Sequence, residues 1–407
     1  MRRAIEQLLA KPLDVDGAVQ VALLRSPHLR ASLEELSVGQ ADLVQAGLLS
    51  NPVFTFGRTA WEQEHISPNL FASVEASFLD LLTLPLKKRV ASAELEATKL
   101  TVADAVLDLA GETRKAYYQA LAAQQAAGVR ALVSEAAEAA AELARRQATA
   151  GTMNDLALNA ELALASQAHL DATRSAGDAA AAREHLNQRM GTWGTSTAWT
   201  LPARLPELPA AELDASHLEQ KAVADRLDLR AARHQLQAVG AALTLARTTR
   251  WTGVVQINVE AGRLRGSRRF SFGPSVGIEL PLFDQRRAAI ARLEAMQRQA
   301  KSELEALAVD VRAEARSATI RVLTARAVAE EYRNRLIPIR ENLVLFSQQQ
   351  YDAMLLGVYQ LLQAKQAEFD SYRETIEAQR DYWIARSDLE RAVGSRLVAP
   401  TPSKGKP

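Results

Sequence analysis

The sequence predicts a mostly helical protein with a small β part, built from two structural repeats. Proline is missing between Pro85 and Pro202 and between Pro281 and Pro338, in stretches rich in alanine, which indicates very long helices. Residue patterns of the first half recur about 200 residues later. Each half also contains short segments that alternate between apolar and polar residues, a pattern typical of strands with one apolar face.

Composition excludes several classes of function. The chain has 407 residues and a formal net charge of +1, so it lacks the basic excess of a nucleic-acid-binding protein, and we expect no nucleic-acid partner. It has no cysteine, which excludes disulfides, thiolate metal sites and cysteine nucleophiles. The six histidines lie in different segments without metal-ligand spacing, and no hydrolase, phosphate-loop or zinc-protease motif occurs. We therefore expect no enzyme activity, no cofactor and no metal site.

Matching residues define the repeats. Leu29-Arg30-Ala31 recurs as Leu229-Arg230-Ala231, and Ala182-Arg183 recurs as Ala385-Arg386. Residues 1–200 form the first repeat and 215–396 the second, joined by a proline-rich linker at 201–214. We expect the tail at 397–407 to be disordered.

Each repeat is predicted to contain a helix, a β-hairpin, a long helix and a last helix. In the first repeat these lie at 14–47, 51–79 and 86–149, followed by a tip at Gly151 and a helix that ends at Gly191. In the second they lie at 215–249, 251–281 and 285–355, followed by a tip at Gly357 and a helix that ends at Gly394. At both tips the glycine is expected to adopt the left-handed backbone conformation, which costs glycine nothing.

The second long helix carries an apolar seam whose mean step is close to the 3.5 residues of a coiled coil. Pro338 falls inside this helix and removes one backbone hydrogen bond, so we expect a kink there. A plain structural coiled coil is the alternative interpretation of the long helices. The seam consists of Leu304, Leu307, Val311, Ala315, Ala318, Val322, Ala325, Ala329, Tyr332 and Leu336.

The alternating segments have the length that a tilted strand needs to cross a bilayer, about 10 residues. Four strands cannot close a barrel, and an open sheet edge in lipid leaves backbone groups unsatisfied, at several kcal/mol each. Closure therefore requires other copies of the chain, and three copies would supply twelve strands. The apolar faces would meet lipid, and five polar residues would line the barrel lumen: Glu75, Gln256, Asn258, Glu260 and Glu279. The alternative is a soluble four-stranded sheet that caps a helical bundle.

The order of elements and several local motifs resemble the TolC-like family of outer-membrane efflux ducts. The resemblance covers nearly the whole chain, although no single motif is specific. The motifs are Asp14-Val15-Asp16-Gly17-Ala18-Val19, Asn51-Pro52, Leu280-Pro281-Leu282-Phe283-Asp284, and Leu356-Gly357 with Leu361-Leu362-Gln363-Ala364-Lys365.

The resemblance implies the outer-membrane channel of a tripartite efflux or export system. Such a protein is a homotrimer with a β-barrel in outer-membrane lipid and an α-helical barrel of long helices in the periplasm. It is a passive conduit that docks on a periplasmic adaptor and an inner-membrane pump. No motif in the sequence indicates whether the transported substrate is a metal ion, a drug or a polypeptide.

By the same resemblance, the far tips of the helical hairpins form the pore entrance and contact the adaptor. Ordinary solvated helix ends are the alternative. If Asp155 and Asp352 face the pore axis, threefold symmetry makes a carboxylate ring that favours cations. The tip residues implied are Arg146, Gly151, Thr152, Asp155, Tyr351, Asp352, Leu356, Gly357 and Val358.

Two features depart from the family. Glu6 and Lys11 interrupt the apolar run of the first residues, so no export signal is visible, and the lipidated cysteine of many members is missing. An outer-membrane location thus depends on a segment upstream of Met1. A soluble long-helix coiled-coil scaffold, cytosolic or periplasmic, is the alternative function.

Overall fold

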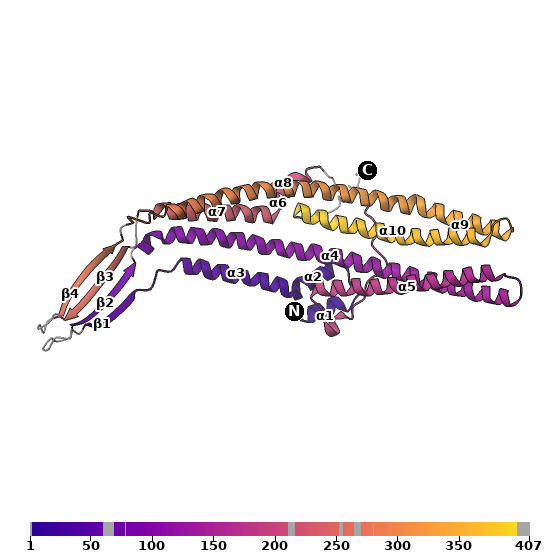
Figure 1. Cartoon of the computed structure of the whole chain (residues 1–407), viewed down its shortest axis with the longest axis horizontal. Helices are drawn as coiled ribbons and strands as arrows, with labels where there is room; N and C mark the ends of the chain where they lie inside the picture. The colour runs from indigo at the N-terminus through magenta and orange to yellow at the C-terminus, as the bar shows by residue number, and fades with distance from the viewer. Residues whose placement is uncertain are drawn as a thin grey trace, which may run out of the picture. The chain divides into compact units, whose positions relative to one another are not determined.

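The computed structural model describes residues 2–59, 69–77, 79–210, 216–251, 255–263, 270–279 and 281–396. These residues are mostly helical, with one four-stranded antiparallel sheet (Figure 1). The chain divides into two compact units, each of which combines segments from both repeats. Unit 1 takes its residues from 1–30, 105–226 and 310–407, and unit 2 from 31–104 and 227–309. The predicted tail at 397–407 lies outside the described residues.

The first helical region of each repeat is broken, where the sequence predicted one helix. In the first repeat α2 (Val15–Arg25) and α3 (Pro27–Ala46) are separated by Ser26, whose ψ of 119° is not helical. A residue before proline is driven out of the helical region by the proline ring, which explains this break. In the second repeat Arg226 separates α6 (Leu218–Asp225) from α7 (Leu227–Thr248), with a ψ of 128°.

No proline follows Arg226, so tertiary contacts hold the second break. The Arg226 side chain is buried and forms an ion pair with Glu314. It also donates a hydrogen bond to the carbonyl of Ala392. A short helix that was not predicted, α1 (Arg2–Leu9), precedes α2.

The long helices differ from the prediction at their ends. Helix α4 (Leu79–Thr149) begins before the expected residue 86 and contains Pro85 in its second turn. Pro85 lies beyond the first turn, where a missing N–H costs nothing, so it removes the helical hydrogen bond to the Leu81 carbonyl. Helix α8 (Arg287–Glu331) is followed by a π turn at Tyr332–Leu336 and by α9 (Ile337–Asp352). The π turn lies directly before Pro338, where the sequence predicted a kink.

The predicted seam of the second long helix is confirmed. Its central members Val311, Ala315, Ala318 and Val322 are at most 2% exposed. Arg312 and Arg316, on a different face, pair instead with Glu219 at distances of 3.7 and 3.1 Å. The coiled-coil spacing therefore identified the packed face of this helix.

The core of unit 1 is closed by the segment that follows α5 (Asp155–Met190). Trp199 is 2% exposed, and its ring nitrogen donates to Oδ1 of Asn187 at 2.8 Å. Beyond it the first part of the linker is packed, because Leu205 is buried and its N–H donates to Gln125. The ring nitrogen of Trp383 donates to the carbonyl of Pro206 at 3.0 Å. Trp383 belongs to the last helix, α10 (Val358–Val393).

The sheet belongs to unit 2 and has the order β1-β2-β3-β4. Its strands are β1 (Val53–Thr59), β2 (Asn69–Ser77), β3 (Val255–Arg263) and β4 (Phe270–Ile278). All three pairings are antiparallel. The two hairpins are joined by the pairing of β2 with β3. The two repeats thus contribute two strands each to one continuous sheet.

Candidate functional site

The register of the sheet places four of the predicted lumen residues on one face. Glu75 is directly opposite Asn258, Glu260 is opposite Ser73, and Gln256 is opposite Ser77. Directly opposed residues in antiparallel strands point to the same side. Glu279, the fifth predicted residue, follows the last residue of β4. The period-2 alternation therefore predicted one polar face correctly across three strands.

One aromatic residue interrupts the polar face. Phe71 is opposite Gly57 on β1 and Gly262 on β3. A Cβ atom on Gly57 would lie 2.2 Å from the Phe71 ring, so the ring covers the position that a side chain would occupy. An aromatic side chain that covers a neighbouring glycine shields a backbone otherwise open to solvent.

The opposite face of the sheet is apolar and exposed. On β1, Phe54 and Phe56 are each 67% exposed, and on β4 Phe272 is 74% exposed. Val276 and Ile278 continue the same face of β4 and are each 63% exposed. A contiguous apolar surface of this kind marks contact with a membrane or another protein.

The sheet has two free edges among the described residues. β1 pairs only with β2, and β4 pairs only with β3. Edge strands present a row of unpaired N–H and C=O groups that serve as a template for another strand. Soluble proteins often prevent such pairing with charged side chains or proline on the edge strand. The nine residues of β4 carry no charge, and Pro274 is its one residue that cannot donate a backbone hydrogen bond.

The tip between α4 and α5 has polar, exposed side chains. Arg146 in the last turn of α4 forms an ion pair with Glu142, with Nε and Oε1 3.0 Å apart. Gly151 has a φ of +74°, as predicted, and Thr152 donates from Oγ1 to the carbonyl of Gln147. Asn154 caps α5 by accepting the N–H of Ala157, so Asp155 stands in the first turn of that helix.

The prediction that Gly357 adopts the left-handed backbone conformation is wrong. Gly357 has a φ of −76° and a ψ of 152°, which is extended backbone that any residue adopts. It is the N-cap of α10, where its N–H donates to Oε1 of Gln360 at 2.9 Å. The residue with left-handed geometry at this tip is Met354, with a φ of +58°.

Backbone hydrogen bonds show why the two glycines are not equivalent. Gly151 N–H bonds to Ala148 and Thr152 N–H to Gln147, the pattern of a Schellman motif. Met354 N–H bonds to Tyr351 and Leu355 N–H to Gln350, with the same spacing. Met354 is thus the counterpart of Gly151, and Gly357 is the counterpart of Asn154. The sequence analysis matched Gly151 with Gly357, which lies three residues beyond its structural counterpart Met354.

The second tip presents apolar side chains that the sequence interpretation missed. Met354 is 94% exposed and Leu355 is 79% exposed. Of the predicted residues there, Tyr351 is 41% exposed and Leu356 is half-buried. Asp352 ends α9 and accepts a hydrogen bond from Gln348. Val358 begins α10, and its side chain lies outside the described residues.

None of the described helices contains a run both long enough and apolar enough to cross a lipid bilayer. In the same part of the chain, no three His, Asp or Glu side chains gather in a way that would hold a metal ion.

Residues 218–395, which cover most of the second repeat, match the model of the family described as outer membrane efflux protein. This match shows that the second repeat is similar in sequence to outer membrane efflux proteins. The match covers α6 to α10 together with β3 and β4. A comparison with curated proteins gave no match.

Solved structures share the fold over nearly the whole chain. The CmeC outer membrane channel of Campylobacter jejuni is 13% identical, with 94% of this chain and 86% of that chain covered and a TM-score of 0.81. A membrane protein from Pseudomonas aeruginosa is 20% identical, with coverages of 93% and 92% and a TM-score of 0.80. The MtrE outer membrane channel of Neisseria gonorrhoeae, solved in its open state, is 17% identical, with coverages of 94% and 89% and a TM-score of 0.75.

The geometry of the two hairpin tips leads to a prediction of stability. Replacing Met354 with glycine should stabilise the folded chain by about 1 kcal/mol, because a side chain costs roughly that much in the left-handed region. The reciprocal change Gly151→Met should destabilise it by a similar amount. Thermal unfolding, followed by circular dichroism, measures both. A lower melting temperature for the Met354→Gly variant would contradict the assignment of the two counterparts.

Proposed function

We propose that three copies of this chain form a passive outer-membrane channel of a tripartite efflux or export system. The observation that carries the proposal is the four-stranded sheet with one exposed apolar face, one polar face and two free edges. Edge closure supplies the reason for assembly: β1 of one copy pairs with β4 of the next, and three copies make a closed barrel of twelve strands. Closure satisfies every edge group, which lipid demands.

The two faces of the sheet fit this arrangement. Phe54, Phe272 and Val276 would face lipid, where their exposure costs nothing. Glu75, Asn258 and Glu260 would face the water-filled lumen. A soluble scaffold, the alternative, would have to cover the same apolar face with protein, and no described element does so.

The helical part would extend into the periplasm, with the hairpin tips at the adaptor. Unit 1 holds both tips. Support for docking comes from the exposed Met354 and Leu355, because apolar side chains at the end of a helical hairpin gain free energy when a partner buries them. The polar tip at Arg146 and Thr152 would supply the rim of the contact.

The closure of the barrel is testable with paired cysteines, since the chain has none of its own. Thr55→Cys on β1, combined in turn with Gly273→Cys, Ser275→Cys and Gly277→Cys on β4, should give covalent trimers in at least one combination. The three β4 positions share the polar face with Thr55, which disulfide geometry requires. A denaturing gel would show a product of about 133 kDa, three copies of the 44.3-kDa chain.

The matched control is Thr55→Cys with Val276→Cys, because Val276 lies on the opposite face and should not react. Monomers from every polar-face combination, together with the detergent-corrected mass of a single chain, would contradict the channel.

The assignment of faces is testable by charge. Val276→Arg should strongly reduce the amount of trimer in the outer-membrane fraction, because arginine facing lipid costs about 2–4 kcal/mol near the bilayer centre. Ser275→Arg, on the adjacent residue but the polar face, should leave assembly close to normal. Equal effects of the two variants would argue against an apolar face in lipid.

The docking tip is testable with Leu355→Ser. The side chain is 79% exposed, so the change should leave the melting temperature unaltered while several-fold less periplasmic adaptor co-purifies with the channel. The control is Leu132→Ser, which changes an exposed leucine on α4 away from this tip and should retain the adaptor. Undiminished adaptor with Leu355→Ser would place the contact elsewhere.

A further inference from the structure

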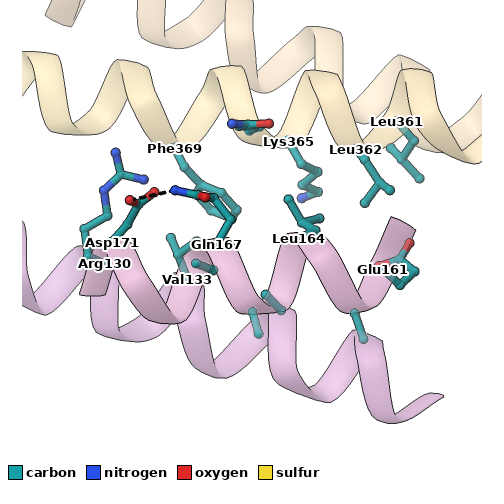
Figure 2. A pocket seen from close by; sticks show the side chains of 15 residues that line it. Arg130, Val133, Glu161, Leu164, Gln167, Asp171, Leu361, Leu362, Lys365 and Phe369 are labelled. Atoms are coloured by element: carbon teal, nitrogen blue, oxygen red, sulfur yellow. Dashed lines mark hydrogen bonds between the residues drawn. The ribbon is translucent and has the colours of Figure 1, made fainter. Parts of the chain in front are cut away.

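Unit 1 contains a cavity of about 360 Å³ between α4, α5 and α10, here called the α5–α10 cavity. Figure 2 shows side chains from the helices on both sides pointing into it, with Leu164 and Lys365 near its middle. Its volume lies within the range of small-molecule sites, about 300–1,000 Å³. None of the predicted tip residues lines the cavity.

Most of the lining is apolar. Val133 and four alanines of α4 and α5 form one wall, and Leu361, Leu362 and Phe369 of α10 form another. Because the alanines are small, no side chain of the described chain fills the space between the walls. An apolar molecular body would gain free energy by doing so.

The charged groups of the lining are paired, with one exception. Arg130 forms an ion pair with Asp370 at 3.0 Å. Nζ of Lys365 lies 3.8 Å from Oε2 of Glu368. Asp171 accepts a hydrogen bond from Gln167, and its Oδ1 lies 3.7 Å from Nη1 of Arg174.

The exception is Glu161 of α5, at the opposite end of the cavity from Arg130 and Asp171 (Figure 2). Only 8% of this residue is exposed, and the described residues offer it no hydrogen bond or ion pair. Burial alone raises the pKa of the Glu161 carboxyl. A buried carboxyl without a partner costs free energy, which a bound positive charge would recover.

We propose that the α5–α10 cavity binds an organic monocation, whose positive charge pairs with Glu161 and whose apolar body fills the alanine- and leucine-lined space. A single carboxylate cannot supply the several oxygen ligands that a divalent metal ion requires, so the complementary ligand is a molecule with one charge and a large apolar part. The site is separate from barrel closure and from the hairpin tips, and it does not depend on the proposed channel function.

Tetraphenylphosphonium is a suitable probe because it is a permanent monocation, and tetraphenylborate is an anion of nearly the same shape. Equilibrium dialysis of the purified full-length protein in a non-ionic detergent should show saturable binding of the cation. The anion should show no saturable binding, so the comparison separates charge recognition from partition into apolar surfaces and detergent.

Glu161→Gln should weaken cation binding about tenfold or more, because it removes the charge at constant shape. Glu138→Gln, an exposed position on α4 outside the lining, is the matched control and should bind like the unaltered protein. Ala168→Leu should also abolish binding by filling the cavity, and Lys365→Met should strengthen it by removing a like charge. Melting temperatures close to that of the unaltered protein would show that these variants fold.

No saturable binding of tetraphenylphosphonium to the unaltered protein would overturn the proposal. Equal binding by the Glu161→Gln variant, or equal binding of cation and anion, would overturn it as well. If the protein forms trimers but does not bind the cation, the proposed channel function stands and the cation site is wrong. If it binds the cation but does not form trimers, the cation site stands and the channel function is wrong.

Discussion

Backbone hydrogen bonding at the edges of the sheet is the constraint on which the rest of this structure depends. The described strands pair in one row, so β1 and β4 each keep one unpaired side. No described residue pairs with these two sides, and four strands are too few to curl into a barrel. The polar and apolar faces, the doubled sequence and the similarity of the second repeat to outer membrane efflux proteins are consistent with a barrel shared among copies.

Much of this organisation could be predicted from the sequence, because its signals are periodic. The alternation of β3 and β4 predicted which side chains share a face, and the apolar spacing from Val311 to Val322 predicted the packed side of α8. Periodicity reports on burial, which acts over many residues at once, so single exceptions such as Phe71 do not obscure it.

Single-residue geometry was less predictable. Proline explains the break at Ser26. The break at Arg226 depends instead on contacts with Glu314 and Ala392, which lie far away in the sequence. Gly357 was assigned a left-handed turn because glycine usually takes that position, whereas the structure gives it to Met354 and uses the glycine as an N-cap. The unpaired Glu161 also had no sequence signal, because its isolation results from the packing of α4, α5 and α10.

The equivalence of the two hairpin tips has a consequence for the history of the molecule. An ancestor with a single repeat would need six identical copies to supply the same strands, and every tip would then carry the same side chains. Joining two repeats in one chain halves the number of copies needed and releases the tips from this identity. One tip has a glycine with polar neighbours, while the other exposes Met354 and Leu355. In the proposed trimer the two repeats would give threefold symmetry with two kinds of tip, so that a partner could distinguish one position around the ring from the next.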